Sequence, residues 1–267
     1  ASVVFGLLFL LLFPIVLYVG LPQTNRTPDT LPLVMAFITA GLLITGMQHI
    51  GIFSDSSVLF VASIAPILQL FGFLNFDLDI IQLGCVASAP PSIRYVARLA
   101  GCLVVLVFLY AIHVVWAVLG GKGIRGATVS LISAAGSMVF LLVTPLVVAS
   151  ILPLQCVDHP NGKRTVLQYP SILCTGEGEH GFMMRFGVVY LTALAIVVAS
   201  CVCATHRLPR EMQRHNAAFA RVFAFLFGRV RPEAYRFPVC YLVRNMVLGL
   251  APALPSTVGQ GVAVMGI

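Results

Sequence analysis

The residues best able to do chemistry lie in one hydrophilic stretch, CVDHPNGKRTVLQYPSILCTGEGEH, at 156–180. Two cysteines, Cys156 and Cys174, enclose most of it. In an oxidising compartment these thiols would form a disulfide, worth about 3 kcal/mol for a loop of this size. A metal site is the alternative, because metal-binding side chains lie close by, at Asp158, His159, Glu177, Glu179 and His180. No spacing here matches a zinc pattern. The sequence therefore favours the disulfide and predicts neither a metal nor a cofactor.

No other group of residues forms a catalytic pattern. The letters G-x-G-x-x-G at 121–126 fall in a tight turn between two apolar runs. A dinucleotide site would need a strand before these letters, a helix after them and an acidic residue about 20 positions further on. The sequence has no nucleophile elbow, no zinc-protease motif and no Cys–His pair with a third group. We therefore expect a protein that is not an enzyme and that binds no nucleic acid.

A few polar side chains interrupt the apolar runs, among them His49, His113 and Asn245. An ionisable residue inside a membrane is by default a functional candidate. A proton or cation relay normally needs a carboxylate, however, and no Asp or Glu lies deep in any of these runs. A packed and hydrogen-bonded side chain is the simpler interpretation of a histidine such as His113.

The elements that carry these residues are long and apolar. The mean hydropathy is +1.00, and only 9% of the residues are charged, against about 25% in a soluble domain. The run at 57–74 contains Pro66 and Gln69 and is either a kinked span or a re-entrant segment. The sequence predicts an all-α, polytopic transmembrane bundle of about seven spans, six to eight in all. We expect one membrane domain over 1–267, as part of a longer chain. Its apolar runs lie at roughly 2–20, 31–50, 57–74, 96–119, 127–152, 183–204 and 238–254.

The distribution of charge predicts the orientation of these spans. Residues 206–236 hold seven arginines and two glutamates, a net charge of +5 in a chain of net charge +7. The positive-inside rule places this stretch in the cytoplasm. Residues 153–182 then form an extracytoplasmic loop, and the sequon at Asn25 lies on the same outer side, where glycosylation is possible. We expect an integral, multi-pass protein of the plasma membrane or an endomembrane, with a cytoplasmic linker at 205–237.

The linker contains an amphipathic pattern. Arginines lie around the rest of the helical wheel, and apolar residues recur at helical spacing at Phe219, Val222, Phe223, Leu226 and Val230. This pattern predicts an amphipathic helix on the anionic cytoplasmic leaflet of the bilayer. Such a helix either rests passively on lipid or acts as a lever that transmits force into the next span.

The turn after that helix is rich in charge. Each arginine there is worth about 1 kcal/mol against an anionic leaflet. Arg244 lies inside the apolar run that follows, near enough to its start for the side chain to extend back to the same surface. The turn is either a topology anchor or an elbow that couples the amphipathic helix to the seventh span. Its charged residues are Arg229, Arg231, Glu233 and Arg236.

Three stretches together resemble one family: FGFLNFDLDIIQLGC at 71–85, the two-cysteine loop at 156–180, and FGRVRPEAYRFPVCYLVRNMVLGL at 227–250. In order and spacing they are similar to large multi-span proteins of oomycetes, dinoflagellates and other protists. The outer parts of those proteins carry ephrin-receptor-like or EGF-like cysteine-rich repeats, and their membrane parts look like transient-receptor-potential and polycystin channels. Tyr235 and Phe237 stand where the family has tryptophans, and Pro238 replaces the acidic residue that would face Arg244.

The resemblance implies a channel-like or sensory protein that conducts cations when complete. It also implies an oligomer or a place in a larger membrane assembly. Two other classes stay open. One is a non-conducting anchor that ties an ectodomain or an assembly to the membrane. The other is a small-solute transporter, which ranks lower because the spans show no carboxylate and no clear inverted repeat.

Overall fold

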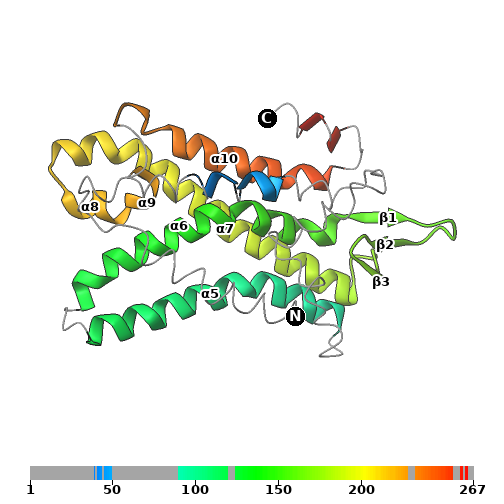
Figure 1. Ribbon diagram of the computed structural model, residues 1–267. Helices are drawn as coiled ribbons and strands as arrows, with labels where there is room; N and C mark the ends of the chain where they lie inside the picture. Colours follow the sequence, from blue (N-terminus) through cyan, green and yellow to red (C-terminus); the bar gives the residue numbers. More distant parts are fainter. Residues whose placement is uncertain are drawn as a thin grey trace.

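The computed structural model describes residues 39, 41–43, 45–49, 90–119, 124–227, 232–254, 259–260 and 262–263. This part of the chain is mostly helical. Four longer helices lie side by side: α5 (Pro91–Leu119), α6 (Ile124–Ile151), α7 (Gly178–Gln213) and α10 (Phe237–Leu250) (Figure 1). The runs predicted at 2–20 and 57–74, and much of the run at 31–50, lie outside the described residues.

Two of the described helices are long and apolar enough to cross a membrane. They are the stretch Ala135–Leu154, which includes most of α6, and the whole of α7. A third span is present if the two parts of α5, Pro91–Gly101 and Leu106–Ile112, count as one across their 41° bend. The short helix η5 (Ala251–Ala253) extends α10 into a shorter apolar helix, Phe237–Ala253. The prediction of long apolar helices is thus confirmed for two or three of them, and the seven-span count stays a prediction.

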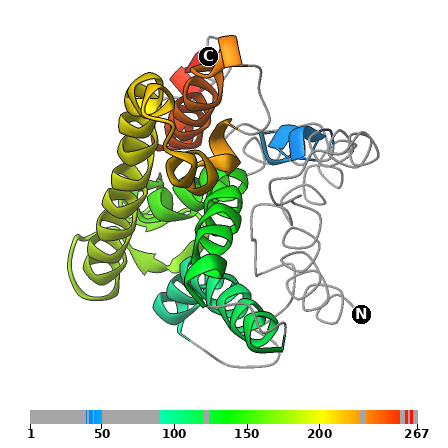
Figure 2. The same cartoon turned by 90° about the vertical axis from the view of Figure 1, so that its left-hand side faces the viewer.

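Helix α6 lies at the centre of the described helices. Figure 2 shows it between α5, α7 and α10, and it contacts all three. Its Val143 and Val147 are fully buried among apolar side chains from α7 and α10, including Leu194, Val198 and Leu242. In contrast, α7 has an exposed apolar face that includes Val189, which is 69% exposed. The central helix is therefore covered by protein, and α7 is peripheral.

Two glycines allow the helices to approach α6 closely. A Cβ on Gly187 of α7 would collide with the backbone carbonyl of Ser150 and would lie 2.6 Å from the Tyr95 hydroxyl. A Cβ on Gly249 of α10 would lie 3.0 Å from the Cβ of Val147. Small residues at such crossings let two backbones come together. The contacts of α6 with α7 and α10 therefore depend on glycine at these two positions.

One end of the bundle carries a small sheet, which corrects the all-α prediction. The short helix η3 (Leu152–Leu154) follows α6 and leads into β1 (Cys156–Asp158), β2 (Arg164–Val166) and β3 (Tyr169–Leu173). The strands are antiparallel and lie in the order β1-β2-β3. Val166, Tyr169 and Ile172 are buried against residues of α5 and α7, namely Tyr95, Leu99 and Met183. This packing on the helix ends accounts for strands that are too short to predict from their sequence.

The opposite end holds the predicted linker, with a different structure from the one expected (Figure 1). Helix α7 continues to Gln213, so residues 205–213 belong to it. The chain turns at His215, whose φ is 53°. The Asn216 side chain then caps α8 (Ala217–Val222) by accepting the N–H of Phe219 at 3.2 Å.

The predicted amphipathic helix is broken at Phe223, where α8 ends and α9 (Ala224–Phe227) begins. The ring of Phe225 lies against Gly136 of α6, and Leu226 is only 1% exposed. The prediction of one continuous helix lying on lipid is therefore wrong for α9. Protein buries Leu226 and covers Phe225 and Phe227 in part.

Candidate functional site

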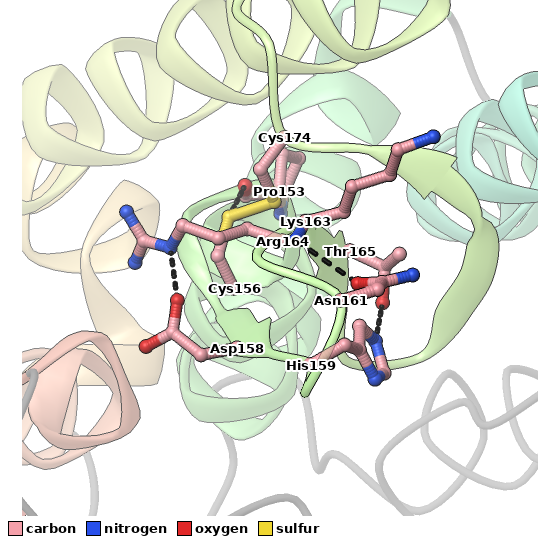
Figure 3. A network of polar contacts seen from close by, with 9 residues as sticks. All are labelled: Pro153, Cys156, Asp158, His159, Asn161, Lys163, Arg164, Thr165 and Cys174. Carbon is pink, nitrogen blue, oxygen red and sulfur yellow. Dashed lines mark hydrogen bonds and ion pairs between the residues drawn. A yellow bond between two sulfur atoms is a disulfide. The ribbon is translucent and has the colours of Figure 1, made fainter.

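The first candidate site is the disulfide-bonded sheet. The structure joins Cys156, the first residue of β1, to Cys174, which follows β3. This is the pair that the sequence favours. The disulfide thus connects the two ends of the sheet. Helix α6 ends shortly before Cys156, and α7 begins shortly after Cys174. The sheet therefore forms a closed unit between two long helices (Figure 3).

Polar contacts hold the exposed part of this sheet in shape (Figure 3). Arg164 on β2 lies 2.9 Å from the carboxylate of Asp158 on β1. The ring of His159 lies 2.6 Å from the Thr165 hydroxyl. The Asn161 side chain accepts the backbone N–H of Lys163 at 3.0 Å, as in an Asx turn. These residues satisfy one another, so Asp158 and His159 are used in the turn and not as a ligand pair.

The geometry also bears on the metal alternative. Among the described residues, Cys156, Cys174 and His180 have ligand atoms within 4.8 Å of one another. Both sulfurs are bonded to each other, however, and both ring nitrogens of His180 have partners. Gly176 N–H donates to Nδ1 at 3.0 Å, so Nε2 carries the proton and donates to the Pro153 carbonyl, also at 3.0 Å. Glu177 and Glu179 are exposed. This arrangement favours the disulfide.

Two arginines that the sequence reasoning missed bind the sheet to α5. Arg94 lies over the ring of Tyr169 with its guanidinium carbon 5.8 Å from the ring centre. One turn later, Arg98 donates to the side-chain carbonyl of Gln168 at 2.7 Å, and it is only 3% exposed. The sequence does contain a signal for these two arginines. Arginines on the outer end of a predicted span oppose the positive-inside rule and need a local partner.

We expect the contact between Arg98 and Gln168 to stabilise the protein measurably. Arg98→Ala should lower the free energy of unfolding by about 2 kcal/mol, because a buried hydrogen bond to a charged group is lost. Arg98 also makes other contacts, so the pair is isolated by a double-mutant cycle with Gln168→Ala, measured by denaturant unfolding. If the two losses simply add, this contact contributes no coupling energy.

The second candidate site is a polar cluster within the apolar helices. His49 lies beside Arg244 and Asn245 of α10. Asn245 is 1% exposed, and neither its carbonyl oxygen nor His49 Nε2 has a hydrogen-bond partner among the described residues. The structure thus brings together three of the predicted polar residues, although His49 and Asn245 are far apart in the sequence. His49 and Asn245 also share a side-chain hydrogen bond, and ionisable groups among apolar helices are functional candidates.

The basic turn before α10 is only partly described. Two of its arginines, Arg229 and Arg231, lie outside the described residues. The same holds for two predicted residues elsewhere in the chain, Asn25 and the side chain of His113 on α5. Glu233, in the short helix η4 (Pro232–Ala234), and Arg236 are both exposed. The guanidinium of Arg236 lies over the ring of Tyr235 and donates to its hydroxyl at 3.2 Å. Pro238 in the first turn favours the start of α10 there. Arg244 has a partner of its own.

Comparisons with known proteins add no relative. No family model, no curated protein and no solved structure matches this chain. The likeness to protist proteins with channel-like membrane parts stays a prediction from the three sequence stretches.

Proposed function

We propose that this chain is the membrane-embedded part of a channel-like or sensory multi-pass protein, as the resemblance implies. The main support is the continuous helix α7, which connects the disulfide-bonded sheet to the basic linker at the other end (Figure 1). Its 36 residues rise about 54 Å, well beyond the hydrocarbon core of about 30 Å. Both of its ends therefore reach water, and a force on one end can act at the other.

In this proposal the basic end faces the cytoplasm and its anionic lipid. Arg207, Arg210 and Arg214 lie near the C-terminus of α7, at the end of the bundle opposite the disulfide. The positive-inside rule and the oxidising compartment that a disulfide requires give the same orientation. The seven-span topology and assembly into an oligomer or a larger complex belong to the same proposal.

The linker contacts the core of the bundle directly. Phe225 fits against Gly136 of α6, and Leu226 joins the apolar core that α6 forms with α7 and α10. A displacement of α8 and α9 would therefore move the side chains that pack on α6. The polar cluster of His49, Arg244 and Asn245 lies further along α10. The same motion would change the position of Arg244 relative to His49. These contacts support an elbow rather than a passive float.

A non-conducting anchor is the second candidate, and one observation favours it. The centre of the described bundle is filled by α6, with Val143 and Val147 at 0% exposure. These helices by themselves leave no path for an ion along their axis. Conduction would therefore need residues outside the described ranges or an interface between copies of the chain.

Recordings from the full-length protein in planar bilayers should separate the two candidates. We expect cation currents, and we expect Arg244→Ala to change the ratio of open to closed channels about fivefold, a coupling of about 1 kcal/mol. Lys163→Ala is the control, because it also removes one positive charge, from the exposed turn between β1 and β2 at the opposite end of the bundle. Silent bilayers with correctly inserted protein would favour the anchor. If Arg244→Ala changed only the membrane topology, the turn would be a topology anchor and not an elbow.

A further inference from the structure

We propose that His180 is a proton-operated latch. When its imidazole is neutral it ties the turn at 174–178 to α7 and to the end of α6, and protonation releases that turn. The proposal concerns the disulfide end of the bundle. It holds whether or not the protein conducts ions.

The latch connects three segments through one buried ring. His180 lies in the first turn of α7 and is 6% exposed. Nδ1 accepts the backbone N–H of Gly176, in the turn before α7, at 3.0 Å. Nε2 lies 3.0 Å from the carbonyl oxygen of Pro153, in the short helix after α6. A single tautomer, with the proton on Nε2, satisfies both contacts.

Protonation is incompatible with one of these contacts. An imidazolium carries hydrogen on both ring nitrogens. The new N–H on Nδ1 would point at the N–H of Gly176, so two donors would face each other and the Gly176 hydrogen bond would be lost. The contact of Nε2 with Pro153 would remain. Histidine is the side chain whose charge changes most readily between about pH 5 and pH 8.

None of the carboxylates that the structure describes is placed to hold the imidazolium in this pocket. Among the described residues, the ring contacts the backbone of Gly176 and Pro153 and lies near the two sulfurs of the disulfide, which do not titrate. Charged groups on the surrounding elements are exposed or already in contact elsewhere. On the turn and α7 they are Glu177, Glu179 and Arg185, on the sheet Asp158 and Arg164, and on α5 Arg94 and Arg98.

The turn itself is built to move once it is released. Gly176 and Gly178 adopt φ values of +79° and +59°, which glycine tolerates without strain. Gly181 packs directly on the carbonyl of Gly176, so the turn and the start of α7 shift together. The disulfide meanwhile keeps Cys174 attached to β1. Acid on this side would therefore loosen the turn and the first residues of α7, while Pro153 still holds His180 and the disulfide keeps the sheet closed.

Hydrogen exchange on the intact protein in lipid nanodiscs tests the latch. Peptides covering 174–182 are followed at about pH 7.5 and about pH 5.5, and each rate is divided by the intrinsic rate at that pH. We expect protection in this peptide to fall about tenfold at the lower pH, while peptides from the centre of α6 stay unchanged. Equal protection at the two pH values would overturn the proposal.

Two variants assign the effect to His180. His180→Asn offers an acceptor and a donor that do not titrate, so the fall in protection should disappear. His159→Asn is the matched control, because His159 is an exposed histidine on the same unit and hydrogen-bonds to Thr165; its pH response should equal that of the wild type. A pH response that persists in His180→Asn would contradict the latch.

A spectroscopic measurement on the wild type covers the case in which His180→Asn does not fold. Nitrogen chemical shifts of the ring report which nitrogen carries hydrogen. We expect an unprotonated Nδ1 while the turn is closed and hydrogen on both nitrogens once acid has loosened it. A ring that stays neutral at the lower pH while the turn still loosens would assign the response to another group.

Discussion

Gly187→Ala is expected to lower the free energy of unfolding by about 3 kcal/mol, the upper range for overpacking. The added methyl group would collide with the backbone carbonyl of Ser150 and crowd the hydroxyl of Tyr95. A backbone atom cannot rotate away, so α7 must move from α6 and α5. The Tyr95 hydroxyl would then lose its hydrogen bond to the Ser150 carbonyl, now 3.2 Å long. Reversible unfolding in a denaturing detergent measures the loss.

Gly101→Ala is the matched control for this change. Gly101 also lies inside a long apolar helix, but no described residue lies within 4 Å of the position that its Cβ would take. The same chemical change should therefore be neutral or should stabilise the protein by up to about 1 kcal/mol, because alanine favours helix over glycine. If both variants lost equal stability, close packing at Gly187 would not be the cause.

The second large effect concerns the disulfide. Replacing Cys156 and Cys174 together by serine should lower the free energy of unfolding by about 3 kcal/mol, since the unfolded chain regains the freedom of an open loop. Adding a reductant to the wild type should give the same loss and should not affect the double variant. Cys203→Ser is the control, because Cys203 is an exposed free cysteine. Its stability should stay at the wild-type value.

Proteolysis without reductant provides an independent check of the same bond. A cut in the exposed turn between β1 and β2 should leave two fragments joined through Cys156 and Cys174. Free thiols at both positions in the folded protein would refute the bridge.

The helices could be predicted because long apolar runs are a strong signal. The runs at 96–119, 127–152, 183–204 and 238–254 fall on α5, α6, α7 and α10. Their ends were less predictable. Helix α7 extends to Gln213 through a stretch of arginines and past Pro209, whereas the hydropathy of the sequence indicates only its apolar part.

The sheet and its arginines could not be predicted in the same way. A strand such as Cys156–Asp158 is three residues long and gives no usable alternation. Its stability comes from burial on α5 and α7, which is a tertiary effect. The partner of Arg98 is Gln168, 70 residues away, and sequence spacing carries no information on such a contact. Only the disulfide pair could be proposed from its residue types and its predicted compartment.

The linker shows a different limit. The spacing of Phe219, Phe223 and Leu226 indicates a helix with one apolar face, but it does not indicate what covers that face. Lipid and protein are equally apolar partners. In the structure Leu226 joins the core around α6. Gly136 of α6 leaves room for the ring of Phe225, and the sequence alone does not indicate that these two residues meet.

The position of α6 has a consequence for the biogenesis of the protein. The three strands and the disulfide join residues at most 18 positions apart, so they can form once the start of α7 has followed them and given the strands a surface to pack on. Helix α10 covers α6 across about a hundred intervening residues, with Gly249 against Val147. Until α10 is synthesised, one side of α6 lacks its native partner. That interval is the one in which the nascent chain is most exposed to aggregation and to recognition by quality-control proteases.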